Sequence, residues 1–170
     1  MAKTLLIMRH GKSSWDDPAL SDHDRPLADR GKREAELMGR ELKRRGLVPD
    51  VILTSTAKRA RSTAKRVMRE LGVDLTLIED RRLYASTPAL CLLALAEQAQ
   101  GETVLLIGHN PTLDELVAEL TAEAVSLSTA SVAVIHLSLA RWADLGRDVT
   151  GDLVSLLSPR GIDLESQRTT

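Results

Sequence analysis

The chain has 170 residues, of which 43% are hydrophobic, and this predicts one domain over residues 1–170 with a full apolar core. Aromatic residues make up only 2%, which argues against a stacking platform for single-stranded nucleic acid. The net charge of −1 gives no general affinity for nucleic acids or membranes. Because no long apolar run is present, we expect no signal peptide or transmembrane helix, and a cytoplasmic location.

In chain order, short apolar runs alternate with stretches in which apolar residues recur at helical spacing. The runs predict strands over 4–8, 51–53, 75–78, 103–107, 132–139 and 153–157. The other stretches predict helices over 29–45, 57–71 and 88–98, and a further helix that starts at Pro111. This alternation is typical of the α/β class, here a three-layer sandwich with a mostly parallel central sheet, helices on both faces and an antiparallel edge strand.

Smaller signals support these boundaries. Gly46 and Gly72 suit the ends of the first two helices, and Thr87 is expected to cap the third, with Pro88 at its first position. The only cysteine, Cys91, can form no disulfide within the chain and lies among apolar residues, which predicts a core position.

Two predicted strands end in a histidine beside a glycine, in Arg9-His10-Gly11 and in Gly108-His109-Asn110. Because ligands bind at the carboxyl ends of strands in open α/β sheets, we expect His10 and His109 in one crevice with Arg9 beside them. Two imidazoles beside a guanidinium are a poor site for a metal cation and a good site for a phosphoryl group. The alternatives are a strand-end ion pair for Arg9 and His10, and a helix-capping role for His109.

A third segment, Ser-x-x-x-Arg-Ala-x-x-Thr-Ala over 55–64, follows the second strand and opens a helix. Free N–H groups at that helix start favour an anion, and Arg59 would direct its planar fork at the same anion. Ser13 is a further candidate phosphate ligand. No His-Glu-x-x-His motif, cysteine pair, carboxylate cluster at ligand spacing or glycine-rich nucleotide loop occurs, so we expect no metal and no cofactor.

Together these segments resemble the histidine phosphatase superfamily, which has the phosphoglycerate mutase-like fold. A fourth segment, over 22–31, is similar to the Asp-x-x-Arg-Pro-Leu-x-x-x-Gly run of the small SixA-type phosphohistidine phosphatases. The resemblance implies a catalytic set and a substrate-binding set. The catalytic set is His10, Arg9, Arg59 and His109. The substrate-binding set is Arg9, Arg59, His109, Gly11 and Ser13.

The chemistry also follows from the groups themselves. Neutral His10 can attack phosphorus through one ring nitrogen if a fixed acceptor holds the proton on the other, and hydrolysis then proceeds through a covalent intermediate. In mutase-like members a glutamate is the general acid, and Ala85 stands at that place here. In acid phosphatases an aspartate follows the late histidine, and here the residue is Asn110. A phosphorylated imidazole needs this acid least, although Glu79 and Asp80 are near enough in sequence to replace it.

We therefore predict a metal-independent phosphatase that acts on phosphohistidine of a protein. The alternatives are a phosphomonoesterase of a small metabolite or sugar phosphate, and a non-catalytic phosphate-binding module. The expected partner is a phosphorylated protein or small molecule, with no nucleic acid or membrane, and the oligomeric state is open. His23 is interpreted as part of a loop network, and Trp15 and Trp142 as packing groups.

Overall fold

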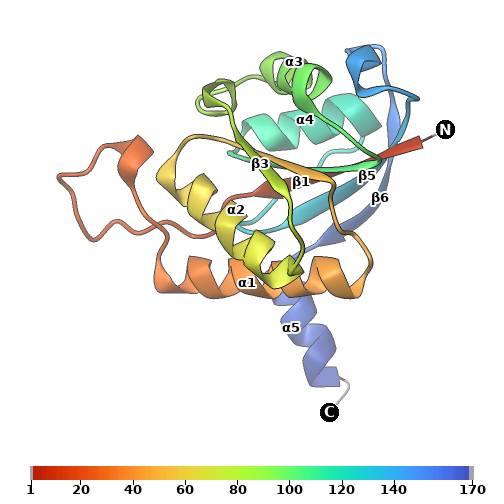
Figure 1. Cartoon of the computed structure of the whole chain (residues 1–170). Helices are drawn as coiled ribbons and strands as arrows, with labels where there is room; N and C mark the ends of the chain where they lie inside the picture. The colour runs from red at the N-terminus through yellow and green to blue at the C-terminus, as the bar shows by residue number, and fades with distance from the viewer. Residues whose placement is uncertain (1, 169–170) are drawn as a thin grey trace.

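The computed structural model describes residues 2–168 of the chain and contains one six-stranded sheet in the order β3-β2-β4-β1-β5-β6 (Figure 1). The strands are β1 (Ala2–Arg9), β2 (Val51–Thr54), β3 (Thr76–Glu79), β4 (Thr103–Gly108), β5 (Val132–Ser138) and β6 (Gly151–Leu157). The pairs β3–β2, β2–β4 and β4–β1 are parallel, whereas β5 pairs antiparallel with both β1 and β6. The predicted mostly parallel sheet with antiparallel pairing at one edge is confirmed.

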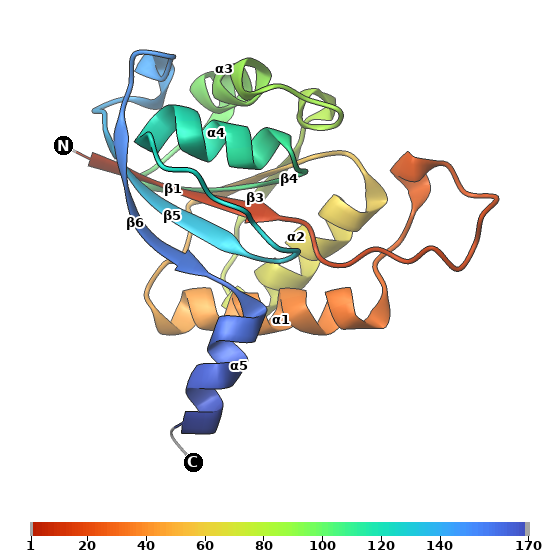
Figure 2. The same cartoon turned by 180° about the vertical axis from the view of Figure 1, so that it is seen from behind.

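Helices cover both faces of this sheet, as Figures 1 and 2 show from opposite sides. They are α1 (Asp29–Arg44), α2 (Lys58–Leu71), α3 (Pro88–Gln98), α4 (Thr112–Thr121) and α5 (Pro159–Arg168). Short 3-10 turns form η1 (Asp22–Asp24), η2 (Arg81–Leu83) and η3 (Trp142–Asp144). Within the described residues, no helix combines the length and the apolar character that crossing a membrane requires.

The core is divided by the sheet because successive side chains of a strand point to opposite faces. In β1, Leu5 and Ile7 pack in the cluster that includes α3 and α4, and Leu6 and Met8 pack in the cluster that includes α1 and α2. All four side chains are fully buried. Cys91 is 2% exposed in the first cluster, so its predicted core position is confirmed.

The helix ends follow the predicted local chemistry. The Thr87 hydroxyl accepts a hydrogen bond from the Leu90 N–H at 3.2 Å and caps α3, with Pro88 as the first helical residue. Gly46 and Gly72, beyond α1 and at the end of α2, have φ of +71° and +67°, the left-handed region that glycine adopts readily.

The parallel strands direct their carboxyl ends to one edge of the sheet. Arg9 of β1 pairs with Gly108 of β4, and Thr54 of β2 pairs with Ile107. Consequently the residues that follow these strands emerge side by side. The segment over 11–28 leaves the same edge as a long arm that projects from the body of the molecule (Figures 1 and 2).

Candidate active site

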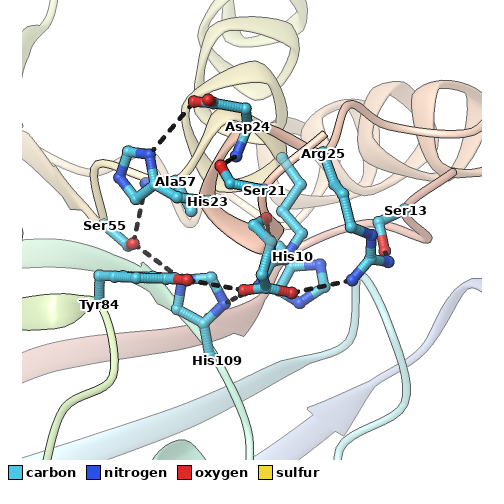
Figure 3. A network of polar contacts seen from close by, with 12 residues as sticks. His10, Ser13, Ser21, His23, Asp24, Arg25, Ser55, Ala57, Tyr84 and His109 are labelled. Carbon is cyan, nitrogen blue, oxygen red and sulfur yellow. Dashed lines mark hydrogen bonds and ion pairs between the residues drawn. The ribbon is translucent and has the colours of Figure 1, made fainter. Parts of the chain in front are cut away.

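His10 and His109 meet at this edge, with ring centroids 5.0 Å apart (Figure 3). The Nδ1 atom of His10 lies 2.7 Å from the carbonyl oxygen of Gly11. Because a carbonyl oxygen only accepts hydrogen bonds, Nδ1 must carry the ring proton, which leaves the lone pair on Nε2. The fixed acceptor that a nucleophilic histidine requires is therefore the carbonyl of Gly11.

Both histidines are neutral at pH 7. Burial lowers the pKa of His10 to about 4, with Arg59, Arg9 and Arg25 acting in the same direction and the bond to the Gly11 carbonyl opposing them. Burial, followed by the charges of His10 and Arg59, lowers the pKa of His109 to about 3. The Nε2 atom of His109 lies 2.8 Å from the hydroxyl of Ser55. The structure therefore shows His109 as a neutral ring that forms a hydrogen bond with Ser55.

Arg59 lies in the first turn of α2, and only 8% of its side chain is exposed. Its Nη1 donates to the backbone oxygen of Asp22 at 2.6 Å, and its Nη2 donates to the Asp22 carboxylate at 3.0 Å. The same Nη2 lies 3.5 Å from Nδ1 of His109. The guanidinium thus joins the second histidine to the arm.

The loop that carries His10 is held from two sides. The fully buried hydroxyl of Thr63 accepts from the Gly11 N–H at 3.0 Å and donates to the Arg59 carbonyl at 2.7 Å. On the other side, a Cβ atom on Gly11 would stand 2.8 Å from the carbonyl oxygen of Gly31 in α1. A Cβ atom on Gly31 would clash with the carbonyl oxygen of Lys12, so close backbone contacts require glycine at both positions.

The structure places two predicted phosphate ligands in additional roles. Arg9 donates from Nη1 to the carbonyl oxygen of Leu127 at 3.0 Å, and its buried Nε has no hydrogen-bond partner among the described residues. The Ser13 hydroxyl accepts a hydrogen bond from Nη2 of Arg25. Ser13 thereby holds a cationic group of the arm.

Sequence reasoning missed the centre of this network, the carboxylate of Asp22. Its Oδ2 accepts from the Tyr84 hydroxyl at 2.7 Å as well as from Arg59, and its Oδ1 accepts from Arg25 at 3.0 Å. These bonds, led by that of Tyr84, lower the pKa of Asp22 to about 2. Asp22 and Arg25 are the two ends of the Asp-x-x-Arg motif, so a signal was present in the sequence. No comparable signal marked Tyr84.

Two other predictions about the arm have different outcomes. His23 bonds the Thr56 hydroxyl at 3.0 Å through Nε2 and lies 3.5 Å from the Asp24 carboxylate through Nδ1, which confirms a loop network. The packing role predicted for Trp15 is wrong, because Trp15 is 71% exposed and covers the Arg25 guanidinium at 3.2 Å from its ring centroid. A tryptophan can cover a cation without entering the core. Trp142 is buried, as predicted.

The carboxylates that could replace a general acid are used elsewhere. Glu79 lies 3.9 Å from Arg61, and Asp80 bonds Arg82 at 2.7 Å. Asn110 donates to the Leu127 carbonyl at 3.0 Å and accepts from the Asp114 N–H at 3.1 Å, so it serves the start of α4.

Ala85 has a φ of +47° and carries no functional group. Across the described part of the chain, no group of three or more His, Cys, Asp or Glu side chains is arranged to hold a metal ion.

Comparisons with known proteins agree with this geometry. The model of the histidine phosphatase superfamily (branch 1) matches residues 5–84. An uncharacterized protein of Mycobacterium tuberculosis is 36% identical over 150 residues, which cover 81% of this chain and 91% of that protein.

Two solved structures share the whole fold. The putative phosphohistidine phosphatase SixA from Nakamurella multipartitia is 30% identical with a TM-score of 0.77, and the match covers 94% of this chain and 97% of that one. The putative phosphohistidine phosphatase SixA from Agrobacterium tumefaciens is 27% identical with a TM-score of 0.78, covering 92% and 98%.

Proposed function

Because this chain belongs to the histidine phosphatase superfamily and has the fold of the SixA-type proteins, we propose that it removes the phosphoryl group from phosphohistidine on a protein. The observation that carries the proposal is the state of His10. Its ring is neutral, its Nδ1 proton is held by the Gly11 carbonyl at 2.7 Å, and its Nε2 lone pair is available for attack.

In the first step, Nε2 of His10 forms a bond to phosphorus while the bond from phosphorus to the substrate imidazole breaks. The bonding electrons pass to the substrate nitrogen. Arg59, Arg9 and His109 donate hydrogen bonds to the non-bridging oxygens of the transferring group. His109 does so through Nδ1, in the tautomer in which Nε2 accepts a hydrogen bond from the Ser55 hydroxyl.

In the second step, water attacks the phosphorylated His10 and releases inorganic phosphate. The ring nitrogen Nε2 recovers its lone pair, and the Gly11 carbonyl holds the same tautomer throughout. Gly11 and Ser13 therefore act through neighbours, Gly11 by orienting His10 and Ser13 by orienting Arg25.

The residues at the two acid positions favour a phosphorus–nitrogen bond over an ester. A missing general acid costs roughly 10²- to 10⁴-fold in rate on a poor alkoxide leaving group. A phosphorylated imidazole whose other ring nitrogen carries a proton leaves as a neutral ring, so Ala85 and Asn110 impose no comparable penalty on it. The ion pairs of Glu79 and Asp80 with Arg61 and Arg82 support this reading.

A protein is the substrate class that suits the arm. Segment 11–28 projects from the sheet edge and carries the exposed ring of Trp15 directly over Arg25. A small metabolite makes little use of such an extended surface, whereas a protein that presents a phosphorylated side chain can contact it.

The test is hydrolysis of a phosphohistidine peptide beside a panel of sugar, alkyl and aryl phosphates. We expect the phosphohistidine peptide to have the highest kcat/KM. Enzyme quenched in base should carry a phosphoryl group at His10 that is stable in base and lost on acidification. His10→Ala should abolish both signals. Efficient hydrolysis of a sugar phosphate without activity on phosphohistidine would instead establish a metabolite phosphatase.

A further inference from the structure

We propose that Asp22 selects the leaving group, because its carboxylate faces the position from which the substrate imidazole departs and accepts the N–H of that ring. This inference rests on the proposed function, since it concerns the leaving-group side of the same site. In this proposal, the carboxylate of Asp22 makes the enzyme prefer a leaving group with a protonated nitrogen over one with an anionic oxygen.

Asp22 is the outermost member of the charged network. Its side chain is 53% exposed, whereas those of Arg59 and Arg25 are each 8% exposed. His10, at the base of the site, is 7% exposed as a whole residue. The carboxylate is therefore more accessible to an arriving substrate than the two guanidinium groups that it joins.

The in-line geometry of phosphoryl transfer determines where the leaving group lies relative to Asp22. The leaving group lies opposite the nucleophile, with the phosphoryl group between them. Nη2 of Arg59 contacts both the Asp22 carboxylate at 3.0 Å and Nδ1 of His109 at 3.5 Å, so one guanidinium nitrogen bridges the carboxylate and His109. Figure 3 shows His10, His109, Tyr84 and Arg25 converging on the same space.

The hydrogen bonds of the carboxylate leave room for one more donor. An ionised carboxylate has about four acceptor positions. Tyr84 and Arg59 take two of them at Oδ2, and Arg25 takes one at Oδ1. The remaining acceptor position, on Oδ1, can receive an N–H from a leaving ring on the far side of the phosphoryl group.

The role is that of a counter-ion rather than a proton donor. The low pKa of Asp22, about 2, keeps it ionised at neutral pH. When the bond between phosphorus and nitrogen breaks, its electron pair stays on the leaving ring. The proton on the other ring nitrogen remains there, held by the carboxylate, and Asp22 itself neither gains nor loses a proton. A leaving oxygen that develops negative charge meets a like charge at the same place.

The test compares kcat/KM for a phosphohistidine peptide and for p-nitrophenyl phosphate, whose leaving group is an anion. Asp22→Asn should lower the ratio of the first to the second by roughly 10- to 100-fold, the effect of losing one charge-assisted hydrogen bond. Part of this change should be a gain on p-nitrophenyl phosphate, because Arg25 and Arg59 then lack their shared anion.

Two further variants separate this role from mere positioning of Arg59. Tyr84→Phe removes a hydrogen bond to Asp22 but keeps the charge, so the ratio should stay within about threefold of wild type even if both rates fall. Asp24→Asn removes the same charge from the same turn, η1, without touching Arg59, and both substrates should stay within about twofold of wild type.

A parallel loss on both substrates in Asp22→Asn, or an unchanged ratio, would show that Asp22 only positions Arg59 and would overturn the inference. If Asp22→Asn does not fold, Asp22→Ser makes the same comparison, since the side chain is more than half exposed. Failure of the proposed function has a different signature: wild-type enzyme that hydrolyses esters and leaves phosphohistidine intact, whatever residue 22 is.

Discussion

Thr63 offers the sharpest test of how the nucleophile is held. Its hydroxyl is fully buried and is the acceptor for the Gly11 N–H, while the carbonyl of the same Gly11 residue accepts from His10. Thr63→Val keeps the shape of the side chain but leaves this N–H without its partner. A buried polar group that loses its hydrogen bond costs about 1–3 kcal/mol, and for a chain of this length about 2 kcal/mol lowers the Tm by roughly 4–8 °C.

The same change should also affect catalysis, because the Gly11 peptide sets the tautomer and direction of the His10 ring. A small displacement of a reacting group costs up to about 10²-fold, so we expect kcat to fall by roughly 10- to 100-fold. Thermal unfolding followed by circular dichroism and steady-state kinetics measure the two effects.

Two control variants make the result specific. Thr63→Ser keeps the hydroxyl and should retain most of the activity. Thr121→Val removes a threonine hydroxyl that bonds Val117 and Glu123 near the exposed end of α4, and it should change stability by less than about 0.5 kcal/mol. A Thr63→Val protein with wild-type Tm and kcat would refute the proposed coupling between α2 and the nucleophile loop.

Three further predictions follow from the site. Because the pKa values of His10 and His109 lie near 4 and 3 in the folded state, below the usual 6.5, the unfolded chain takes up protons first as the pH falls. The contribution of these histidines to the free energy of unfolding is therefore complete above pH 6.5 and is lost as the pH falls below it. The shift of His10 alone should lower the free energy of unfolding by about 2 kcal/mol between pH 7 and 5. Urea titrations at the two pH values should show this loss in the wild type and not in His10→Asn. Arg59→Lys should lower kcat/KM at least about tenfold because the planar fork is lost, whereas Arg61→Lys on the helix surface should stay within about twofold; equal effects would contradict the role of Arg59. Treatment with a chelator should leave activity unchanged, and loss of activity with recovery on adding zinc or magnesium would refute a metal-independent mechanism.

The sequence predicted the sheet and α1–α4 because each strand and helix carries its own local signal. It missed α5, whose apolar pattern is weak, although Ile162 of this helix is buried. The predicted start of β3 at residue 75 is one residue early, at an exposed strand with no sharp change of polarity.

Part of the candidate site could likewise be predicted from the sequence, and part could not. His10, Ser55 and His109 follow strands whose carboxyl ends share an edge, so alternation of elements was enough to bring them together. The contacts of Asp22 with Arg59 and Tyr84 span 37 and 62 residues and depend on how the arm folds back over the sheet. No periodic pattern in the sequence predicts how the arm folds, although the Asp-x-x-Arg motif contains Asp22 and Arg25, two of the residues that it brings to the site.

The two ends of the arm are bonded to each other, and η1 returns to the body. Near its start and end, the Ala28 N–H bonds the Lys12 carbonyl at 2.8 Å, and η1 reaches back to Arg59. The residues between, over 16–20, are exposed. We expect a change of length or composition there to leave His10, His109 and Thr63 in place, because their hydrogen bonds run to Gly11, Ser55 and Arg59. Exchanging these few residues can therefore change the surface that the arm presents, while the reacting groups at the edge of the sheet keep their positions.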